Sequence, residues 1–191
     1  MQIRRVHAVY FSGTGTTEKT VRRIAAQAAQ QLGAELSAID FTPPQARQET
    51  LRFAPEELVI FGVPTYAGRV PNVLLPFLKE RVQGGGALAA AVVLFGNRNF
   101  DDSLIELRDI LCADGFAVVG GAAWRGGYMQ FTGANHIQLP NSLLAGQSAA
   151  TMLAVRAPQS KPAMVALSIL SASISAMASA ASADGWPLRS V

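Results

Sequence analysis

The 191-residue chain is long enough to bury one substantial core, and its formal net charge of +3 arises after Asp114, where four basic residues accompany a single acid. It has no Lys/Arg cluster of the kind that marks a nucleic-acid-binding face, so we expect no nucleic-acid partner. The single cysteine excludes a disulfide framework and an iron–sulfur cluster.

Strands and helices are predicted to alternate along the first two thirds of the chain. The first residues lack the apolar run of a signal peptide, which favours a cytoplasmic location. Apolar runs predict strands over residues 6–11, 36–41, 58–63, 88–95 and 116–124. Apolar residues at helical spacing predict helices over 17–32, 73–82 and 101–113, with Gly33 as a stop signal for the first. Residues 43–57 form a polar connection with room for one helical turn.

This alternation predicts a parallel sheet with right-handed crossovers. In such a sheet the ligand lies beyond the carboxyl ends of the strands, at the point where the strand order switches. Three loops rich in glycine and hydroxyl side chains follow predicted strands. We therefore expect the three loops to meet at one edge of the sheet.

The first loop combines glycines with hydroxyl side chains in the order Ser12, Gly13, Thr14, Gly15, Thr16 and Thr17. Glycines let the backbone approach a ligand, and the amides and dipole at the start of the following helix favour an anion. The loop lacks the lysine of a Walker P-loop and the three-glycine spacing of a dinucleotide site. A monophosphate fits best, and the alternative is a turn that merely caps the helix.

The second loop places an aromatic ring among small residues and consists of Pro64, Thr65, Tyr66, Ala67 and Gly68. The face of Tyr66 suits a planar ring, whose polar edge can meet the amides of residues 65–68. The alternative is an ordinary half-buried tyrosine. Arg69 is expected to be solvated rather than to meet a ligand or a partner.

The third loop contains Gly96, Asn97, Arg98, Phe100 and Asp101. Gly96 and Asn97 suit a tight turn, and Asp101 or Asp102 is well placed to cap the next helix. Phe100 supplies a second aromatic ring for a ligand or packs into the core, and the sequence leaves both possibilities open.

Few residues outside the loops suggest chemistry. Cys112 shares a helical pattern with three leucines and is expected to be a buried apolar residue rather than a reactive thiol. His7 lies in or beside the first strand and is interpreted as structural. The sequence has no Ser-His-Asp, metal-ligand or paired-carboxylate constellation, so it predicts neither catalytic residues nor a metal site.

Residues 11–19, 62–71 and 95–102 together resemble the flavodoxin domain of ferredoxin–flavodoxin fusion proteins, without their iron–sulfur half. The resemblance covers about residues 3–124 and implies a flavodoxin-like three-layer α/β sandwich. Its parallel five-stranded sheet would have the order 2-1-3-4-5. The resemblance also implies FMN as the cofactor, with its phosphate on residues 12–17, its isoalloxazine against Tyr66, and the loop over 97–101 closing on the other side.

The function implied by this resemblance is electron transfer between redox partners that the sequence does not identify. One alternative is an FMN-dependent NAD(P)H oxidoreductase of the quinone or flavin reductase type, and another is a domain that no longer retains flavin. A reductase needs a pocket for two substrates above the flavin. No added loop that would build one is evident in residues 1–124, which favours the carrier.

Residues 125–191 form an atypical segment that is rich in Ala and Ser and nearly free of charge. Within it, residues 162–183 are long enough to cross a bilayer, but six serines argue against a membrane span. We expect a loosely packed helix or a poorly ordered tail there. The composition fits two origins, a reading-frame shift near residues 124–127 or a divergent tail kept by selection.

Overall fold

The computed structural model describes residues 2–96 and 99–125, and their main sheet has five parallel strands. The order in space is β2-β1-β4-β6-β7, which is 2-1-3-4-5 when these five strands are counted along the chain. The predicted flavodoxin-like order is therefore confirmed. The strands are β1 (Arg5–Tyr10), β2 (Glu35–Asp40), β4 (Glu57–Pro64), β6 (Leu88–Phe95) and β7 (Ala117–Arg125).

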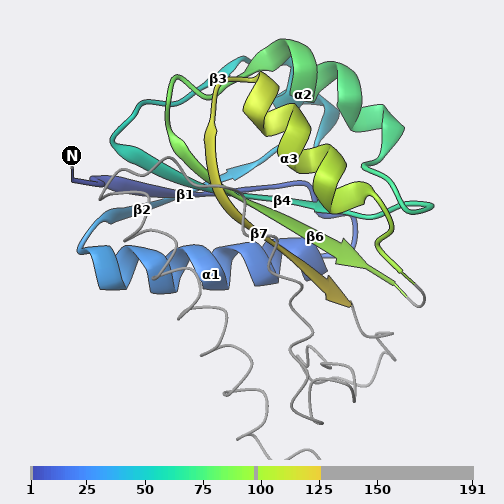
Figure 1. Ribbon diagram of the computed structural model, residues 1–191, viewed down its shortest axis with the longest axis horizontal. Coiled ribbons are helices and arrows are strands. Elements are labelled where there is room, and N and C mark those ends of the chain that lie inside the picture. Colours follow the sequence, from blue (N-terminus) through green and yellow to red (C-terminus); the bar gives the residue numbers. More distant parts are fainter. Residues whose placement is uncertain (1, 97–98, 126–191) are drawn as a thin grey trace, which may run out of the picture.

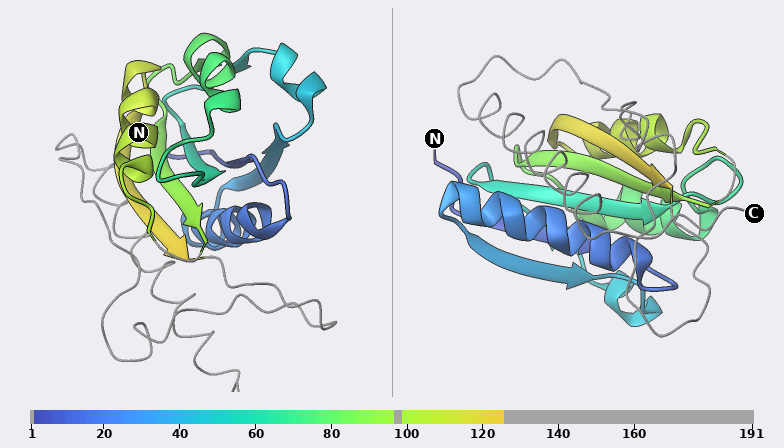
Figure 2. Two further views of the ribbon diagram at one scale, coloured as in Figure 1. Left: turned by 90° about the vertical axis from the view of Figure 1, so that its right-hand side faces the viewer. Right: turned by 90° about the horizontal axis from the view of Figure 1, so that it is seen from below.

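Helices cover both faces of this sheet, as expected for a parallel sheet. Helix α1 (Thr16–Leu32) lies on one face, and α2 (Leu75–Arg81) and α3 (Ser103–Ala113) lie on the other (Figure 1). The end-on and underside views show the same separation into three layers (Figure 2). Gly33 ends α1 in the left-handed conformation at φ 61°, which confirms the predicted stop signal.

Two apolar clusters form the core, one on each face of the sheet. The alternate residues Val6, Ala8 and Tyr10 of β1 face α1, and Val9 belongs to the opposite cluster. The second cluster is rich in aromatic residues, and the rings of Phe41 and Phe77 stack 5.1 Å apart. Strands β4 and β6 are buried along almost their whole length, which is why they read as continuous apolar runs in the sequence.

Short elements account for most differences from the prediction. The connection after β2 holds the 3₁₀ helix η1 (Pro44–Gln48) and the strand β3 (Leu51–Arg52). β3 pairs in parallel with β5 (Val82–Gln83). The two strands form a second, small sheet that was not predicted from the sequence. The predicted helix over residues 73–82 is shorter, because η2 (Asn72–Leu74) precedes α2 and Val82 has joined β5.

The prediction that Cys112 is buried is wrong, because its side chain is exposed. Helix α3 turns Leu104, Leu107 and Leu111 toward the sheet. Cys112 follows Leu111 by one residue, which is about 100° around a helix, and so it leaves the buried stripe.

No helix within residues 2–96 and 99–125 has both the length and the apolar character needed to cross a membrane. The predictions for the segment after Arg125, including residues 162–183, lie outside the described residues.

Candidate functional site

The first loop joins β1 to α1 and leaves the start of the helix without a side-chain cap. Gly15 occupies the N-cap position with φ 79°, a left-handed conformation that glycine adopts easily. In the described part of the chain, no side chain hydrogen-bonds the N-terminal amides of α1 as a cap. The first N–H groups of a helix also lack intrahelical partners. These amides, at the positive end of the helix dipole, are therefore available to an anion.

Two hydroxyl side chains of this loop lie close together, and a third is buried. The Oγ1 atoms of Thr14 and Thr16 lie 3.4 Å apart. The Ser12 amide donates to Thr42 Oγ1 at 2.8 Å, which anchors the loop on the residues after β2. Ser12 Oγ is buried and has no hydrogen-bond partner within residues 2–96 and 99–125. Buried polar atoms are rarely left unpaired, so this hydroxyl fits a ligand that supplies an acceptor.

Close packing fixes the start of α1 against the sheet. A Cβ atom on Gly62 of β4 would lie 2.2 Å from Val21 Cγ2 and 3.2 Å from Thr17 Cγ2. No larger residue fits at this position without moving the helix. The side chain of Thr17 is buried in this contact and is not accessible to a ligand.

Polar contacts hold the next turn of α1 to the end of β1. Tyr10 Oη accepts hydrogen bonds from Arg22 and donates to Glu18 Oε1 at 3.1 Å. Arg22 and Glu18 also pair directly, with their nearest atoms 3.0 Å apart. Burial raises the pKa of Tyr10, so its hydroxyl stays protonated at neutral pH.

The second loop is a two-residue hairpin beyond β4. Tyr66 and Arg69 exchange both backbone hydrogen bonds, at 3.0 and 3.1 Å. Ala67 and Gly68 between them have φ of 51° and 78°, the signature of a type I′ turn. A left-handed alanine is unfavourable and is typical of strain kept at functional sites.

The hairpin holds Tyr66 beside the first loop. The side chain is 54% exposed, which is unusual for a large aromatic residue. Its hydroxyl lies 3.7 Å from the point where a Cβ of Gly13 would stand. The exposed ring and the first loop are thus neighbours.

The third loop meets the hairpin directly. Gly96 is exposed at the end of β6, and Asn97 and Arg98 lie outside the described residues. Asp101 has φ 40°, and a Cβ on Gly68 would lie 2.5 Å from its Oδ2 atom. Phe100 is partly buried, with its ring 5.4 Å from that of Phe95, so it packs at the margin of the core.

The first turns of α3 carry further contacts to the hairpin segment. Asp102 occupies the predicted N-cap position, although no side-chain cap bond forms there within the described residues. Thr65 Oγ1 and Ser103 Oγ share a hydrogen bond of 2.7 Å. Pro64 ends β4, and the Thr65 amide donates to the Leu94 carbonyl at 2.7 Å. The segment after β4 is therefore tied to both β6 and α3.

Arg69 is not simply solvated, as the sequence led us to expect. Its Nε and Nη2 atoms donate to Glu106 at 3.0 and 2.8 Å, and the Val70 amide donates to the same carboxylate at 2.8 Å. The hydrogen bond from Arg69 holds the pKa of Glu106 below its usual value. Sequence reasoning missed Glu106 and Ser103, because no spacing relates them to a loop more than thirty residues earlier.

An open groove of about 670 Å³ borders the hairpin along α2 and α3. Four carboxyl groups and two cationic groups line it among apolar residues: Arg69, Lys79, Asp102, Ile105, Glu106, Asp109, Ile110, Ala113 and Asp114. Burial raises the pKa of Asp114 to about 6. Even this carboxyl is therefore mostly ionised at neutral pH, and the four carboxylates outnumber the two cations of the groove.

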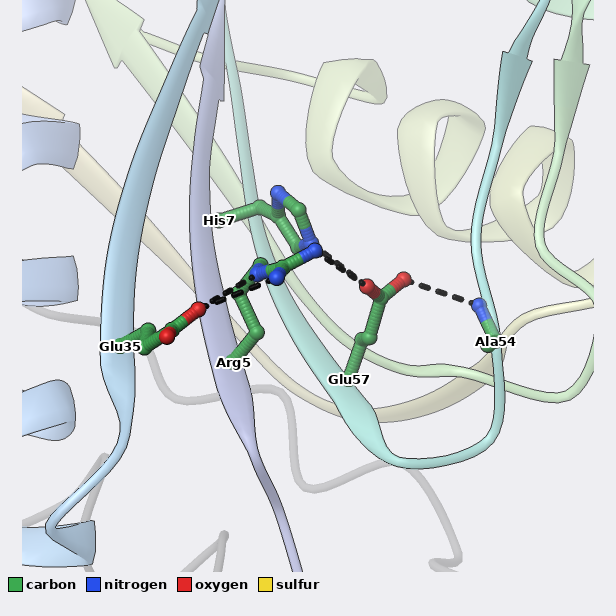
Figure 3. Close-up of polar contacts among 5 residues, drawn as sticks. All are labelled: Arg5, His7, Glu35, Ala54 and Glu57. Atoms are coloured by element: carbon green, nitrogen blue, oxygen red, sulfur yellow. Dashed lines mark hydrogen bonds and ion pairs between the residues drawn. The ribbon is translucent and has the colours of Figure 1, made fainter.

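The other polar cluster of interest lies at the opposite edge of the sheet, near the amino ends of β1, β2 and β4 (Figure 3). His7 Nε2 lies 3.1 Å from Glu57 Oε1, and Glu57 Oε2 accepts from the Ala54 amide at 2.9 Å. Arg5 reaches Glu35 at 3.0 Å and Glu57 at 3.6 Å. His7 is buried away from the three loops, which favours the structural interpretation.

Comparison with solved structures supports the fold. An NADH:FMN oxidoreductase in its apo form is 16% identical with a TM-score of 0.53, over 93% of this chain and 89% of that chain. A flavodoxin from Streptococcus pneumonia TIGR4 is 12% identical with a TM-score of 0.48, over 91% and 99% of the two chains. A flavodoxin from the domain Archaea is 17% identical with a TM-score of 0.46, over 60% and 77%. No protein-family model and no curated protein matches the sequence.

Proposed function

We propose that this chain is a flavodoxin-like electron carrier that binds FMN at the edge formed by its three loops. One observation carries the proposal: the loop between β1 and α1 combines an uncapped helix start with the Ser12 hydroxyl, which is buried and has no hydrogen-bond partner within the described residues. The phosphate would be held by the amides that open α1 and by the hydroxyls of Ser12, Thr14 and Thr16. Neutral donors of this kind suit a monophosphate.

The hairpin would hold the ring of the cofactor. Tyr66 offers an exposed aromatic face next to the phosphate loop. The amides of Ala67 and Gly68 would be the donors for the polar edge of the ring, because those of Thr65 and Tyr66 already donate to the Leu94 and Arg69 carbonyls. Bound FMN supplies one- and two-electron chemistry, and the protein positions it and limits its access to water. The motifs of the three loops also favour kinship with the flavodoxin domain of ferredoxin–flavodoxin fusion proteins.

The acidic groove favours a carrier over an NAD(P)H oxidoreductase. It borders the hairpin through Arg69, but that guanidinium is already paired with Glu106. Asp109 is paired with Arg108 in the same way, which leaves Lys79 against Asp102 and Asp114 among the lining residues. Such a surface repels the pyrophosphate of a nicotinamide dinucleotide.

Reconstitution followed by anaerobic reduction tests the proposal. The purified chain, incubated with FMN and then freed of unbound ligand, should retain flavin and melt at a higher temperature than the apoprotein. Dithionite should bleach the bound flavin, whereas NADH and NADPH should bleach it only slowly. Rapid bleaching by either nicotinamide would establish the reductase instead. Failure to retain FMN or to gain thermal stability would refute the site and support a chain that no longer binds flavin.

A further inference from the structure

A single carboxylate on α3 holds both the last residue of the hairpin and the residue after it. Glu106 accepts two hydrogen bonds from the Arg69 guanidinium and one from the Val70 amide. Its side chain is 16% exposed, so the three bonds form in a largely enclosed setting. Hydrogen bonds to a charged acceptor are stronger than neutral ones, and a bidentate pair also fixes direction.

These bonds act on a hairpin whose own backbone hydrogen bonds, between Tyr66 and Arg69, close a strained turn. Ala67 is in the left-handed region, which alanine disfavours, and Tyr66 is mostly exposed. A strained turn persists only where its surroundings impose it. Glu106 ties down the carboxyl end of the turn, and the Thr65–Ser103 hydrogen bond ties down the opposite end.

We propose that Glu106 is a positioning residue that fixes the Tyr66 hairpin in the orientation needed to hold the flavin ring. This inference rests on the proposed function and assigns a role that is separate from phosphate binding. Glu106 touches neither the first loop nor the start of α1 in the described contacts. Loss of the Glu106 carboxylate should therefore weaken the binding of the flavin ring and leave the binding of the phosphate unchanged.

Two substitutions on the same helix separate positioning from a general effect of charge. Glu106→Gln removes the charge of the carboxylate and keeps its size. Asp109→Asn makes the same change one turn further along α3, at a side chain that is 60% exposed and pairs with the neighbouring Arg108. Both residues line the acidic groove, so each substitution removes one negative charge from it.

The experiment measures the affinity of each variant for FMN and for riboflavin, which lacks the phosphate. Glu106→Gln should lower both affinities by about tenfold, because weakened hydrogen bonds to a charged group free the hairpin. The ratio of the FMN and riboflavin affinities should stay as in the wild type. The bound flavin should also fluoresce more strongly, because Tyr66 no longer stacks firmly on it. Asp109→Asn should leave both affinities within about twofold.

The outcomes distinguish this inference from the proposed function. If the wild type binds FMN and Glu106→Gln changes neither affinity, or lowers that for FMN alone, the positioning role is wrong. If the wild type binds neither flavin, the proposed function fails and the role of Glu106 fails with it. Should Glu106→Gln not fold, Arg69→Met serves in its place, since it keeps the bond from the Val70 amide. Arg69→Met should lower the affinities for FMN and riboflavin by the same factor, and that factor should be smaller than the tenfold expected for Glu106→Gln. Unchanged affinities would overturn the inference.

Discussion

At the scale of single residues, Thr14 tests where the anion binds. Thr14 is exposed in the first loop, and Thr14→Glu would place a carboxylate where the phosphate is proposed to lie. Charge repulsion should lower the affinity for FMN by at least about tenfold. A titration with FMN, followed by flavin fluorescence, measures the dissociation constant of each variant. Thr50→Glu, outside the three loops, is the control and should bind FMN as the wild type does. Equal affinities for the two variants would rule out the phosphate site.

Asp114 gives a prediction for stability against pH. Burial raises the pKa of Asp114 to about 6 from its ordinary value of 3.8, so between these pH values the folded chain binds a proton that the unfolded chain has released. The free energy of unfolding therefore falls as the pH rises through this interval and levels off above it. Asp114→Asn removes the buried charge and should stabilise the protein at pH 7, with little effect near pH 4.

Urea unfolding at both pH values measures this difference. Asp109→Asn, which neutralises an exposed carboxylate of the same helix, is the control and should show little dependence on pH. A stabilisation by Asp114→Asn that is equal at both pH values would mean that burial does not raise the pKa of this group.

Single residues were predicted well where the backbone alone decides their place. Gly33 ends α1, as predicted, because it adopts a left-handed conformation, and Gly15, which opens the same helix, does so too. The exposure of Cys112 was predicted wrongly, and the ion pair of the exposed Arg69 was missed, since each depends on neighbouring elements. The exposure of Cys112 follows from the rotation of α3, and the pairing of Arg69 depends on a residue that is distant in sequence.

At the scale of elements, the packing of α1 against β4 sets the position of the first loop, where the phosphate is proposed to bind. Gly62→Ala would bring a methyl group against Val21 and push the start of α1 away from the sheet. We expect a loss of about 1–3 kcal/mol in the free energy of unfolding, together with weaker FMN binding. Denaturant unfolding and flavin titration measure the two effects.

A second substitution provides the control for this prediction. Val21→Ala removes the Cγ2 atom that the new methyl group would meet. The double variant Gly62→Ala/Val21→Ala should therefore be less destabilised than the two single changes sum to. If the destabilisations of the two single variants simply add in the double variant, contact with Val21 is not the cause of the destabilisation by Gly62→Ala.

The long elements were predictable because each buries a continuous or periodic apolar face. Leu88–Phe95 matches the predicted strand, and α1 differs from its prediction by one residue. The short strands β3 and β5 were missed, because two residues carry no usable periodicity and their pairing is decided by tertiary contacts. The end of α2 was misplaced for the same reason, since Val82 pairs with Leu51 instead of continuing the helix.

At the scale of the whole molecule, the alternation of strands and helices predicted the parallel sheet. The resemblance to flavodoxins implied the order of its strands, and that order is confirmed. The alternation also predicted that the three loops would meet, and contacts between Gly13 and Tyr66 and between Gly68 and Asp101 show that they do. The acidic groove and the His7–Glu57 cluster are each formed by side chains from separate elements, so no local sequence pattern predicted them. The positions of Asn97 and Arg98 toward a cofactor stay a prediction.

The central claim is that the start of α1 recognises the phosphate of FMN. Calorimetric titration of the wild-type apoprotein with FMN and with riboflavin tests it most directly, because the two ligands share the ring and differ in the phosphate. The account predicts that FMN binds at least about tenfold more tightly than riboflavin, since several donors and a helix terminus act on the phosphate. Equal affinities for the two flavins, or no binding of FMN, would contradict it.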